Sequence, residues 1–150
     1  MRTETVILHS DLNCYYASVE MNEHPELKGK KIAVCGSTEN RHGIVLTASY
    51  PAKRSGVKTG MANWQAKQAC PDLIIVDPHY DMYLHYSSIV RSIYKRYAND
   101  IEPFGMDENW ILLDGCRNVE HDGLAIAEEI RETVKEETGL TVSIGVSFSK

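Results

Sequence analysis

The sequence lacks long hydrophobic runs and any secretion signal. None of its 150 residues lies in an apolar stretch long enough to cross a membrane. The short apolar run that follows the first five residues has no signal-peptide cleavage pattern, and there are no internal repeats. These absences favour a cytoplasmic protein. A hydrophobic content of 43% with 25% charged residues is ordinary for one globular unit.

Paired cysteines are missing as well. The four cysteines are widely separated along the chain: Cys14, Cys35, Cys70 and Cys116. Zinc sites and disulfide frameworks need closely spaced or numerous cysteines, so we expect neither, and we interpret these residues as reduced thiols. The six histidines show no metal-binding spacing on a shared helix face, and we interpret them as surface or packing residues.

Positive charge is in short supply. The chain carries 16 Lys and Arg against 21 Asp and Glu, a net charge of −5. Because Lys and Arg supply most of the nonspecific affinity for nucleic acid, two interpretations stay open. Either nucleic acid is not the partner, or the main surface that grips it lies outside these residues.

Hydrophobic periodicity and turn residues predict an alternation of strands and helices. Strands are expected at 5–11, 31–35, 43–48, 73–76 (short and buried) and 140–147, helices at 14–23, 51–56, 63–70, 81–98 and 123–137, and a β-hairpin at 101–114. Without an insert at about 24–78, the order is β-α-β-β-α-β, the ferredoxin-like arrangement. The predicted fold is therefore α+β, a mixed or antiparallel sheet with helices on one face.

The two long helices have clear amphipathic patterns. In helix 81–98 the expected core stripe is Met82, Tyr86, Ile89, Ile93 and Tyr97. In helix 123–137 the expected inner face is Leu124, Ala127, Ile130 and Val134. Asp122 is the expected N-cap of that helix and Gly139 its stop.

Acidic residues follow two of the predicted strands. Asp107 and Glu108 lie at the tip of the hairpin, and Asp11 ends the first strand. Because side chains alternate along a strand, neighbouring acids converge on one target only at a turn. Carboxylates from different strands suit Mg²⁺, which prefers oxygen ligands. A solvated acidic turn is the alternative.

Three motifs together resemble the Y-family (translesion, DNA polymerase IV-like) DNA polymerases. They are Asp11-Leu12-Asn13-Cys14-Tyr15-Tyr16-Ala17-Ser18-Val19-Glu20, then Leu46-Thr47-Ala48-Ser49-Tyr50 with Lys53, then Met106-Asp107-Glu108. Their order and spacing match the family, and the likeness covers essentially all 150 residues. The resemblance implies a palm made of residues 1–23 and 79–150, with residues 24–78 as small inserted fingers.

The resemblance also implies an activity. It is template-directed DNA synthesis of the translesion type, in which deoxynucleotides are added to a primer 3′-hydroxyl by two-Mg²⁺ phosphoryl transfer, in DNA repair and damage tolerance. The implied partners are primer–template DNA, deoxynucleoside triphosphates and a sliding clamp, the last through a C-terminal part that this chain lacks. Asp11, Asp107 and Glu108 would be catalytic and would hold the two metal ions together with the backbone carbonyl of Leu12.

The same resemblance implies a set of nucleotide-binding residues: Asn13, Cys14, Tyr15, Tyr16, Thr47, Tyr50 and Lys53. Tyr16 would lie beneath the sugar and exclude a 2′-hydroxyl by its bulk. Tyr50 and Lys53, three residues apart, would share a helix face and contact the β- and γ-phosphates together with Thr47. The roof over the nascent base pair would consist of Ile44, Leu46 and Gly60.

The chain departs from the family pattern at three points. Lys53 stands where Arg is usual, so the phosphate contact would lack a bidentate fork. Asn13 stands where many relatives carry Asp, and we do not count it as a metal ligand. The chain also stops within a further family motif at 145–150, so the thumb and little-finger domains are absent. These residues alone are expected to have little or no polymerase activity.

Three other functions fit parts of the pattern. A Mg²⁺-dependent phosphohydrolase would use Asp11 as nucleophile, but Asn13 does not supply the second acid that such enzymes usually need. A palm-type nucleotide cyclase could use Asp107 and Glu108, but it would need neither Tyr16 nor the inserted segment. A module that binds nucleotide and metal without turnover is the non-enzymatic alternative.

Overall fold

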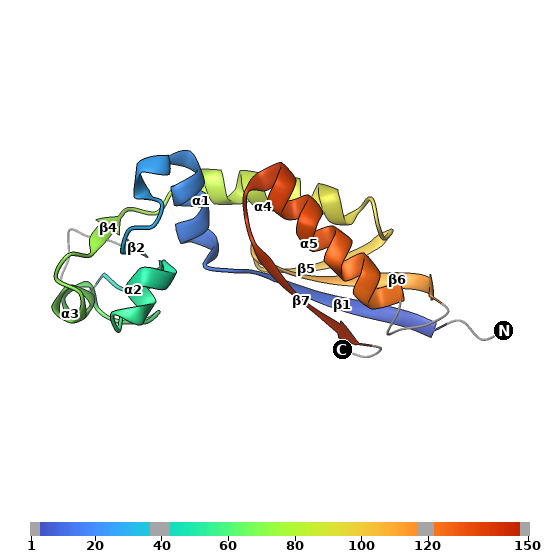
Figure 1. The fold of residues 1–150 in the computed structure, drawn as a ribbon, viewed down its shortest axis with the longest axis horizontal. Helices are drawn as coiled ribbons and strands as arrows, with labels where there is room; N and C mark the ends of the chain where they lie inside the picture. Colours follow the sequence, from blue (N-terminus) through green and yellow to red (C-terminus); the bar gives the residue numbers. More distant parts are fainter. Residues whose placement is uncertain (1–3, 37–42, 117–121, 148–150) are drawn as a thin grey trace. The chain divides into compact units, whose positions relative to one another are not determined.

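The computed structural model describes residues 4–36, 43–116 and 122–147, and the chain forms two compact units (Figure 1). Unit 1 consists of Met1–Asn13 with Leu84–Lys150, and unit 2 of Cys14–Tyr83. Each unit has its own β-sheet. The predicted palm and fingers boundaries stay a prediction. No helix within the described ranges is long and apolar enough to cross a membrane.

Unit 1 is built on a four-stranded sheet. Its strands are β1 (Glu4–Leu12), β5 (Asp100–Phe104), β6 (Glu108–Cys116) and β7 (Val142–Ser147). They lie in the order β5-β6-β1-β7, with every neighbouring pair antiparallel. Helix α5 (Leu124–Thr138) and the second half of α4 (Tyr80–Tyr94) cover one face of the sheet, as Figure 1 shows. The α+β, ferredoxin-like prediction is confirmed.

Burial alternates along β1. Val6, Leu8 and Ser10 are fully buried on the helix-covered face, whereas His9 and Asp11 point to the opposite face. On that opposite face Ile7 is still buried, but exposure rises along the strand to the acidic end at Asp11.

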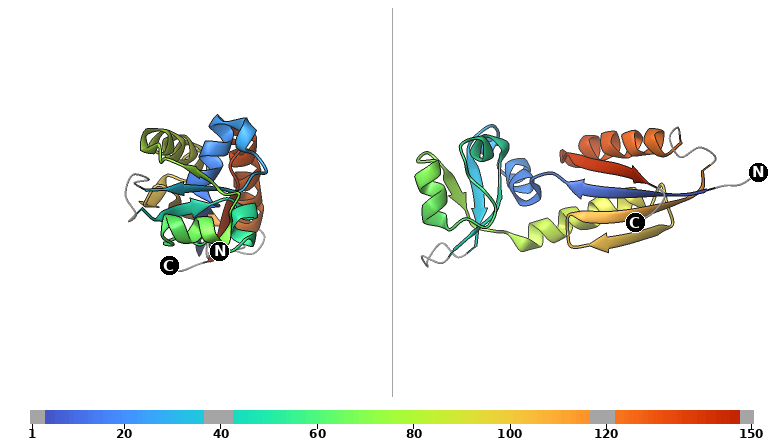
Figure 2. Two further views of the ribbon diagram at one scale, coloured as in Figure 1. Left: turned by 90° about the vertical axis from the view of Figure 1, so that its left-hand side faces the viewer. Right: turned by 90° about the horizontal axis from the view of Figure 1, so that it is seen from below.

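Unit 2 contains a smaller, three-stranded sheet. Its elements are α1 (Tyr15–Glu23), a 3₁₀ turn (Pro25–Leu27), β2 (Ile32–Cys35), β3 (Val45–Ala48), α2 (Tyr50–Arg54), α3 (Asn63–Ala69) and β4 (Ile74–Val76). Strand β2 is central, antiparallel to β3 and parallel to β4 (Figure 2). The expectation of a buried strand at 73–76 was wrong: Leu73 is buried just before β4, but the strand itself is exposed or half-buried, because β4 lies at the edge of the sheet.

The expected core stripe of α4 was wrong by about one residue. Of its five members only Ile93 is fully buried, and the buried row includes Tyr83, Val90 and Tyr94. The polar Ser87 also lies in this row, because its hydroxyl bonds a backbone carbonyl of the hairpin. A search for regularly spaced apolar residues does not identify a buried serine.

Helix α5 follows its prediction at the end but not at the start. Ala127, Ile130 and Val134 are buried, whereas Leu124 is 58% exposed. The N-cap is Gly123 rather than Asp122, with no side-chain cap bond. Gly123 is buried against the sheet, where an added Cβ would lie 2.8 Å from Val146 and 3.0 Å from Val6, so the glycine and not Leu124 takes the inner position at the start of the helix. Gly139 ends the helix with a φ of 77°, as predicted.

Candidate active site

The acidic strand ends lie side by side in unit 1. In the pairing of β1 with β6, Asp11 is directly opposite Glu108, so both side chains are on the accessible face. The backbone N–H of Leu12 donates to the carbonyl of Asp107 at 2.9 Å. The strand pairing therefore places Asp11 and Leu12, at the end of β1, beside Asp107 and Glu108, at the start of β6.

A glycine and hydrogen bonds from α4 fix the hairpin turn that carries Asp107. Gly105 has a φ of 71°, which favours glycine. The Ser87 hydroxyl of α4 donates to the carbonyl of Met106 at 2.8 Å, and Arg91 donates to the Ser87 oxygen at 2.9 Å. These bonds hold the position of Asp107 relative to the sheet.

The carboxylates destabilise one another when ionised. Burial, followed by the charge of Glu108, raises the pKa of Asp11. Burial, with a smaller contribution from the charge of Asp11, raises the pKa of Asp107 against a backbone hydrogen bond that lowers it. Burial and the Asp11 charge also raise the pKa of Tyr94, beneath the sheet, to about 12. Such concentrated negative charge suits a bound cation.

His9 was missed by sequence reasoning. Its Nε2 atom lies 3.4 Å from Glu108 Oε1, and its ring packs on Trp110 with a centroid distance of 4.4 Å. The alternation of a strand could have found it, because His9 and Asp11 are two residues apart and share a face.

Within the part of the chain that the structure describes, no three His, Cys, Asp or Glu side chains are grouped closely enough to hold a metal ion as they stand. Like charges separate, and Glu108 instead lies near His9. The donor set of Asp11, Asp107 and Glu108 offers only oxygen and three negative charges, which fits a hard divalent cation. The assignment of these residues as metal ligands stays a prediction.

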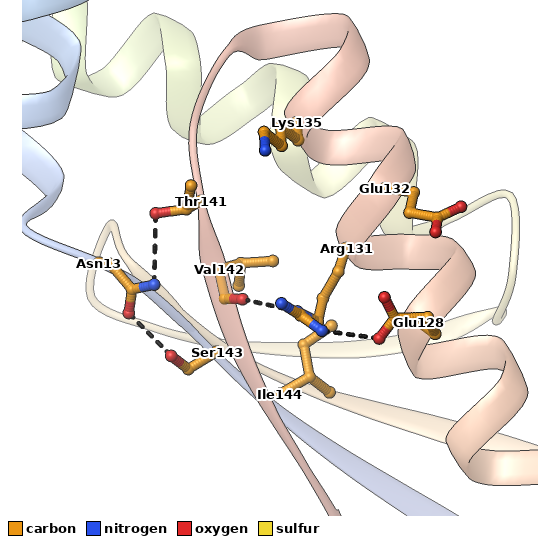
Figure 3. Close-up of a pocket in the computed structure, with 9 residues that line it drawn as sticks. All are labelled: Asn13, Glu128, Arg131, Glu132, Lys135, Thr141, Val142, Ser143 and Ile144. Atoms are coloured by element: carbon orange, nitrogen blue, oxygen red, sulfur yellow. Dashed lines mark hydrogen bonds and ion pairs between the residues drawn. The ribbon is translucent and has the colours of Figure 1, made fainter.

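The Asn13 side chain forms hydrogen bonds at the edge of the sheet. Its amide donates to Thr141 Oγ1 at 3.3 Å, and its oxygen accepts from Ser143 Oγ at 2.8 Å (Figure 3). Its backbone N–H also donates to the carbonyl of Thr141 at 3.0 Å. These residues line a groove of about 480 Å³ between β7 and α5. Asn13 thus joins the end of β1 to β7.

In unit 2, the residues for which phosphate contacts were predicted lie on neighbouring elements. Lys53 Nζ is 5.5 Å from the centre of the Tyr50 ring, so the two share a face of α2 as expected. The same ammonium group contacts Cys14 Sγ at 3.2 Å. Cys14 begins α1 with a φ of 45° and no side-chain cap bond. Thr47 is half-buried in β3.

Of the three predicted roof residues, Leu46 lies in β3, Ile44 directly precedes that strand, and Gly60 lies in a turn bonded to it. Ile44 is 45% exposed and forms an isolated bridge with Ala62. Leu46 is half-buried, two residues further on. Gly60 has a φ of 90°, and its N–H donates to the carbonyl of Val45 at 2.8 Å. The structure brings Ile44 and Gly60 next to the same strand, and their role stays a prediction.

Tyr16 belongs to an aromatic cluster that sequence reasoning did not find. Its ring stacks on Tyr83 with a centroid distance of 4.3 Å and an interplanar angle of 11°. Tyr80 packs edge-on against both rings. The spacing of Tyr80 and Tyr83, one helical turn apart on α4, was the available signal.

Comparison with known proteins identifies relatives of the whole chain. Residues 10–150 match the family described as "impB/mucB/samB family". Over 145 residues the chain is 50% identical to the DNA polymerase IV of Acetivibrio thermocellus, covering 97% of this chain and 36% of that protein. The chain therefore spans well under half the length of this relative.

Solved structures give the same result. A structure described as "Insertion ternary complex of Dbh DNA polymerase" matches with a TM-score of 0.87 and 31% identity, over 97% of this chain and 43% of that one. A chimera described as a Y-family DNA polymerase matches with a TM-score of 0.88 and 29% identity, over the same shares of the two chains. The resemblance to the Y-family is confirmed.

Proposed function

Because this chain belongs to the impB/mucB/samB family, we propose that the protein containing it is a template-directed DNA polymerase of the translesion type. Its reaction would be the addition of deoxynucleotides to a primer 3′-hydroxyl. The chain spans 36% of one DNA polymerase IV, so the proposal concerns the protein as a whole. The relatives are named as DNA polymerases, which gives no support to the phosphohydrolase or cyclase alternatives.

The observation that carries the proposal is the strand register that sets the acidic end of β1 beside the acidic start of β6. Asp11 faces Glu108 across the sheet, and Asp107 is tied to the neighbouring Leu12 backbone. Burial, and then the charge of Glu108, raises the pKa of Asp11. Burial, with a smaller contribution from the charge of Asp11, raises the pKa of Asp107. A structural turn gains nothing from this repulsion, whereas a cation-binding site needs it.

Y-family DNA polymerases generally use divalent metal ions, and we propose two Mg²⁺ ions here. Asp11, Asp107 and Glu108 would hold them, with the backbone carbonyl of Leu12 as a further ligand. When bound, such ions lower the pKa of the primer hydroxyl and neutralise the triphosphate and leaving pyrophosphate. The turn anchored by Ser87 would keep the carboxylates in place during phosphoryl transfer, which depends mainly on positioning and charge.

In unit 2 we assign the nucleotide contacts. Lys53 and Tyr50 present a cation and a hydroxyl from one face of α2 and would bind the β- and γ-phosphates together with Thr47. The start of α1, at Cys14, would offer backbone N–H groups to phosphate oxygens. Tyr16 would exclude a 2′-hydroxyl.

Three further residues of unit 2 are assigned to the base pair. The exposed Ile44 would cover the nascent pair together with Leu46 and Gly60. Leu46 is half-buried, and Gly60 has no side chain to fill the space above a damaged template base.

The partners and location form part of the proposal. Primer–template DNA and deoxynucleoside triphosphates would be the substrates, and a sliding clamp would bind outside the present chain. A main DNA grip elsewhere in the protein would also explain the net charge of −5. We propose a cytoplasmic location, which agrees with the free thiols of Cys14, Cys35 and Cys70.

The proposal is tested by primer extension with the whole protein. Asp107→Asn and Glu108→Gln are expected to abolish nucleotide addition, because each removes a charge that would hold metal. Glu102→Gln is the matched control, since Glu102 is an exposed carboxylate on β5 of the same hairpin and faces Trp110. It is expected to retain activity. Extension by either of the first two variants at the wild-type rate would contradict the assignment.

A further inference from the structure

We propose that the buried Glu20, together with the exposed His79, forms an anchor that holds the Tyr83 ring against Tyr16 and so sets how strictly the sugar of the nucleotide is selected. The proposal rests on the proposed function, in which Tyr16 excludes the 2′-hydroxyl. It assigns a positioning role to two residues that lie behind the tyrosine stack.

Glu20 is the most deeply buried acid of the described residues. Its side chain in α1 is fully buried, yet two polar side chains, those of His79 and Tyr83, reach its carboxylate. The Tyr83 hydroxyl donates to Glu20 Oε1 at 3.2 Å, and His79 Nδ1 contacts both carboxylate oxygens, Oε2 at 3.1 Å. A buried carboxylate is tolerated only when it is well hydrogen-bonded. The Tyr83 hydroxyl and the His79 ring supply these hydrogen bonds.

The anchor fixes both ends of Tyr83. His79 and Tyr83 are one helical turn apart, and the N–H of Tyr83 bonds the carbonyl of His79 at 3.2 Å. The Tyr15 hydroxyl donates to the carbonyl of Tyr83. The ring is fully buried, with its hydroxyl held by Glu20 and its face against Tyr16. The Tyr83 ring therefore has one position available.

The half-buried Tyr16 relies on this surface for its own orientation. Its ring lies nearly parallel to Tyr83, at 4.3 Å between centroids. If Tyr83 were free to tilt, Tyr16 could tilt with it, and the space beside the sugar would widen. A shift well below 1 Å matters for a residue that discriminates by bulk, because interiors are close-packed.

The experiment measures kcat/KM for a deoxynucleotide and for the matching ribonucleotide in primer extension by the whole protein. Tyr83→Phe keeps the ring and removes the bond to Glu20. We expect the ratio of the two values to fall about threefold to tenfold, since the buried hydrogen bond to Glu20 is lost and only part of its energy reaches Tyr16. Deoxynucleotide kcat/KM should stay within about twofold. Tyr80→Phe, at an exposed ring of the same cluster, is the matched control and should change neither.

The histidine supplies a rescue test. His79→Leu should lower sugar selectivity as Tyr83→Phe does. His79→Gln, which keeps a hydrogen-bond donor at this position, should keep the selectivity of the wild type. A merely structural role would lower both kcat/KM values together, and that result would overturn the proposal. Unchanged selectivity in both Tyr83→Phe and His79→Leu would do the same.

Two further measurements separate this proposal from the proposed function. If Tyr16→Ala leaves sugar selectivity unchanged, the role of Tyr16 itself fails. If Tyr16→Ala relaxes selectivity and the anchor variants do not, only the anchor fails. Should the whole protein show no extension, ¹³C-tyrosine NMR of the 150-residue chain still decides whether Tyr83→Phe mobilises the Tyr16 ring, and an unchanged Tyr16 signal would refute the anchor.

Discussion

Replacing Asp11 by asparagine is expected to stabilise the metal-free protein at neutral pH. The pKa of Asp11 is raised from 3.8, by burial and then by the charge of Glu108. The folded state therefore binds the proton more tightly than the unfolded chain, and ionisation of Asp11 costs folding free energy. The stability that the protonated acid provides is fully present below pH 3.8 and is lost as the pH rises through the folded-state pKa.

The size of the effect follows from the strand pairing. Side chains directly opposite one another, as Asp11 and Glu108 are, have Cβ atoms about 5 Å apart. Two like charges at that distance repel by about 0.8 kcal/mol in water and by about 3 kcal/mol at an effective dielectric constant near 20. Asp11 is exposed, so solvent screening favours the lower figure. We therefore expect about 1 kcal/mol, or about 2–4 °C in Tm for a domain of this size.

The assay is thermal unfolding of the 150-residue chain, followed by circular dichroism with a chelator and again with Mg²⁺. Asp100→Asn is the matched control: it removes the same charge from an exposed residue of β5 that faces Leu112 instead of an acid. In chelator at pH 7 the Asp11→Asn variant should melt above wild type and above the control, and the gap should close toward pH 3.8. Mg²⁺ should stabilise wild type more than Asp11→Asn, by about 1.4 kcal/mol at ten times its Kd.

Two results would refute this reasoning. If Asp11→Asn melts at or below the Tm of Asp100→Asn in chelator at pH 7, the carboxylates do not repel as the pairing implies. If Mg²⁺ raises the Tm of Asp11→Asn as much as that of wild type, Asp11 does not hold the ion.

Two other outcomes are expected. Gly139→Ala should lower the free energy of unfolding by about 1 kcal/mol, because Gly139 has a φ of 77° at the end of α5. Urea unfolding measures this effect, with Glu136→Ala, an exposed change in the same helix, as the control. Equal stability of the two variants would contradict the prediction. Lys53→Met should raise the Kd for a deoxynucleoside triphosphate about tenfold, the scale of one hydrogen bond to a charged group. Lys53→Arg should bind the triphosphate at least as tightly as wild type. Fluorescence titration measures both Kd values, and an unchanged Kd in Lys53→Met would exclude Lys53 from the phosphate contacts.

Local features of the molecule were predictable because they depend on neighbours in the sequence. Gly139 ends α5, and the apolar spacing of Ala127, Ile130 and Val134 marks its inner face. The hairpin and the order of elements gave the ferredoxin-like sheet. Leu124 was assigned wrongly, because Gly123 takes the inner position against the sheet at the start of the helix and leaves Leu124 exposed.

The candidate site depends on contacts between distant segments. Sequence motifs identified Asp11, Asp107 and Glu108, but the register that sets Asp11 opposite Glu108 arises from the pairing of two complete strands. The proximity of His9 to Glu108 follows from the same register.

By itself, the sequence determined the kinds of element, their order and the residues able to carry charge, because hydrophobic period and turn chemistry act over a few positions. The tertiary structure alone decided which face of α4 is buried and which donors reach Glu20. A fully buried carboxylate takes its partners from whatever packs around it. In this chain those partners are Tyr83, in the first turn of α4, and His79, the residue just before that helix, both far along the sequence from Glu20.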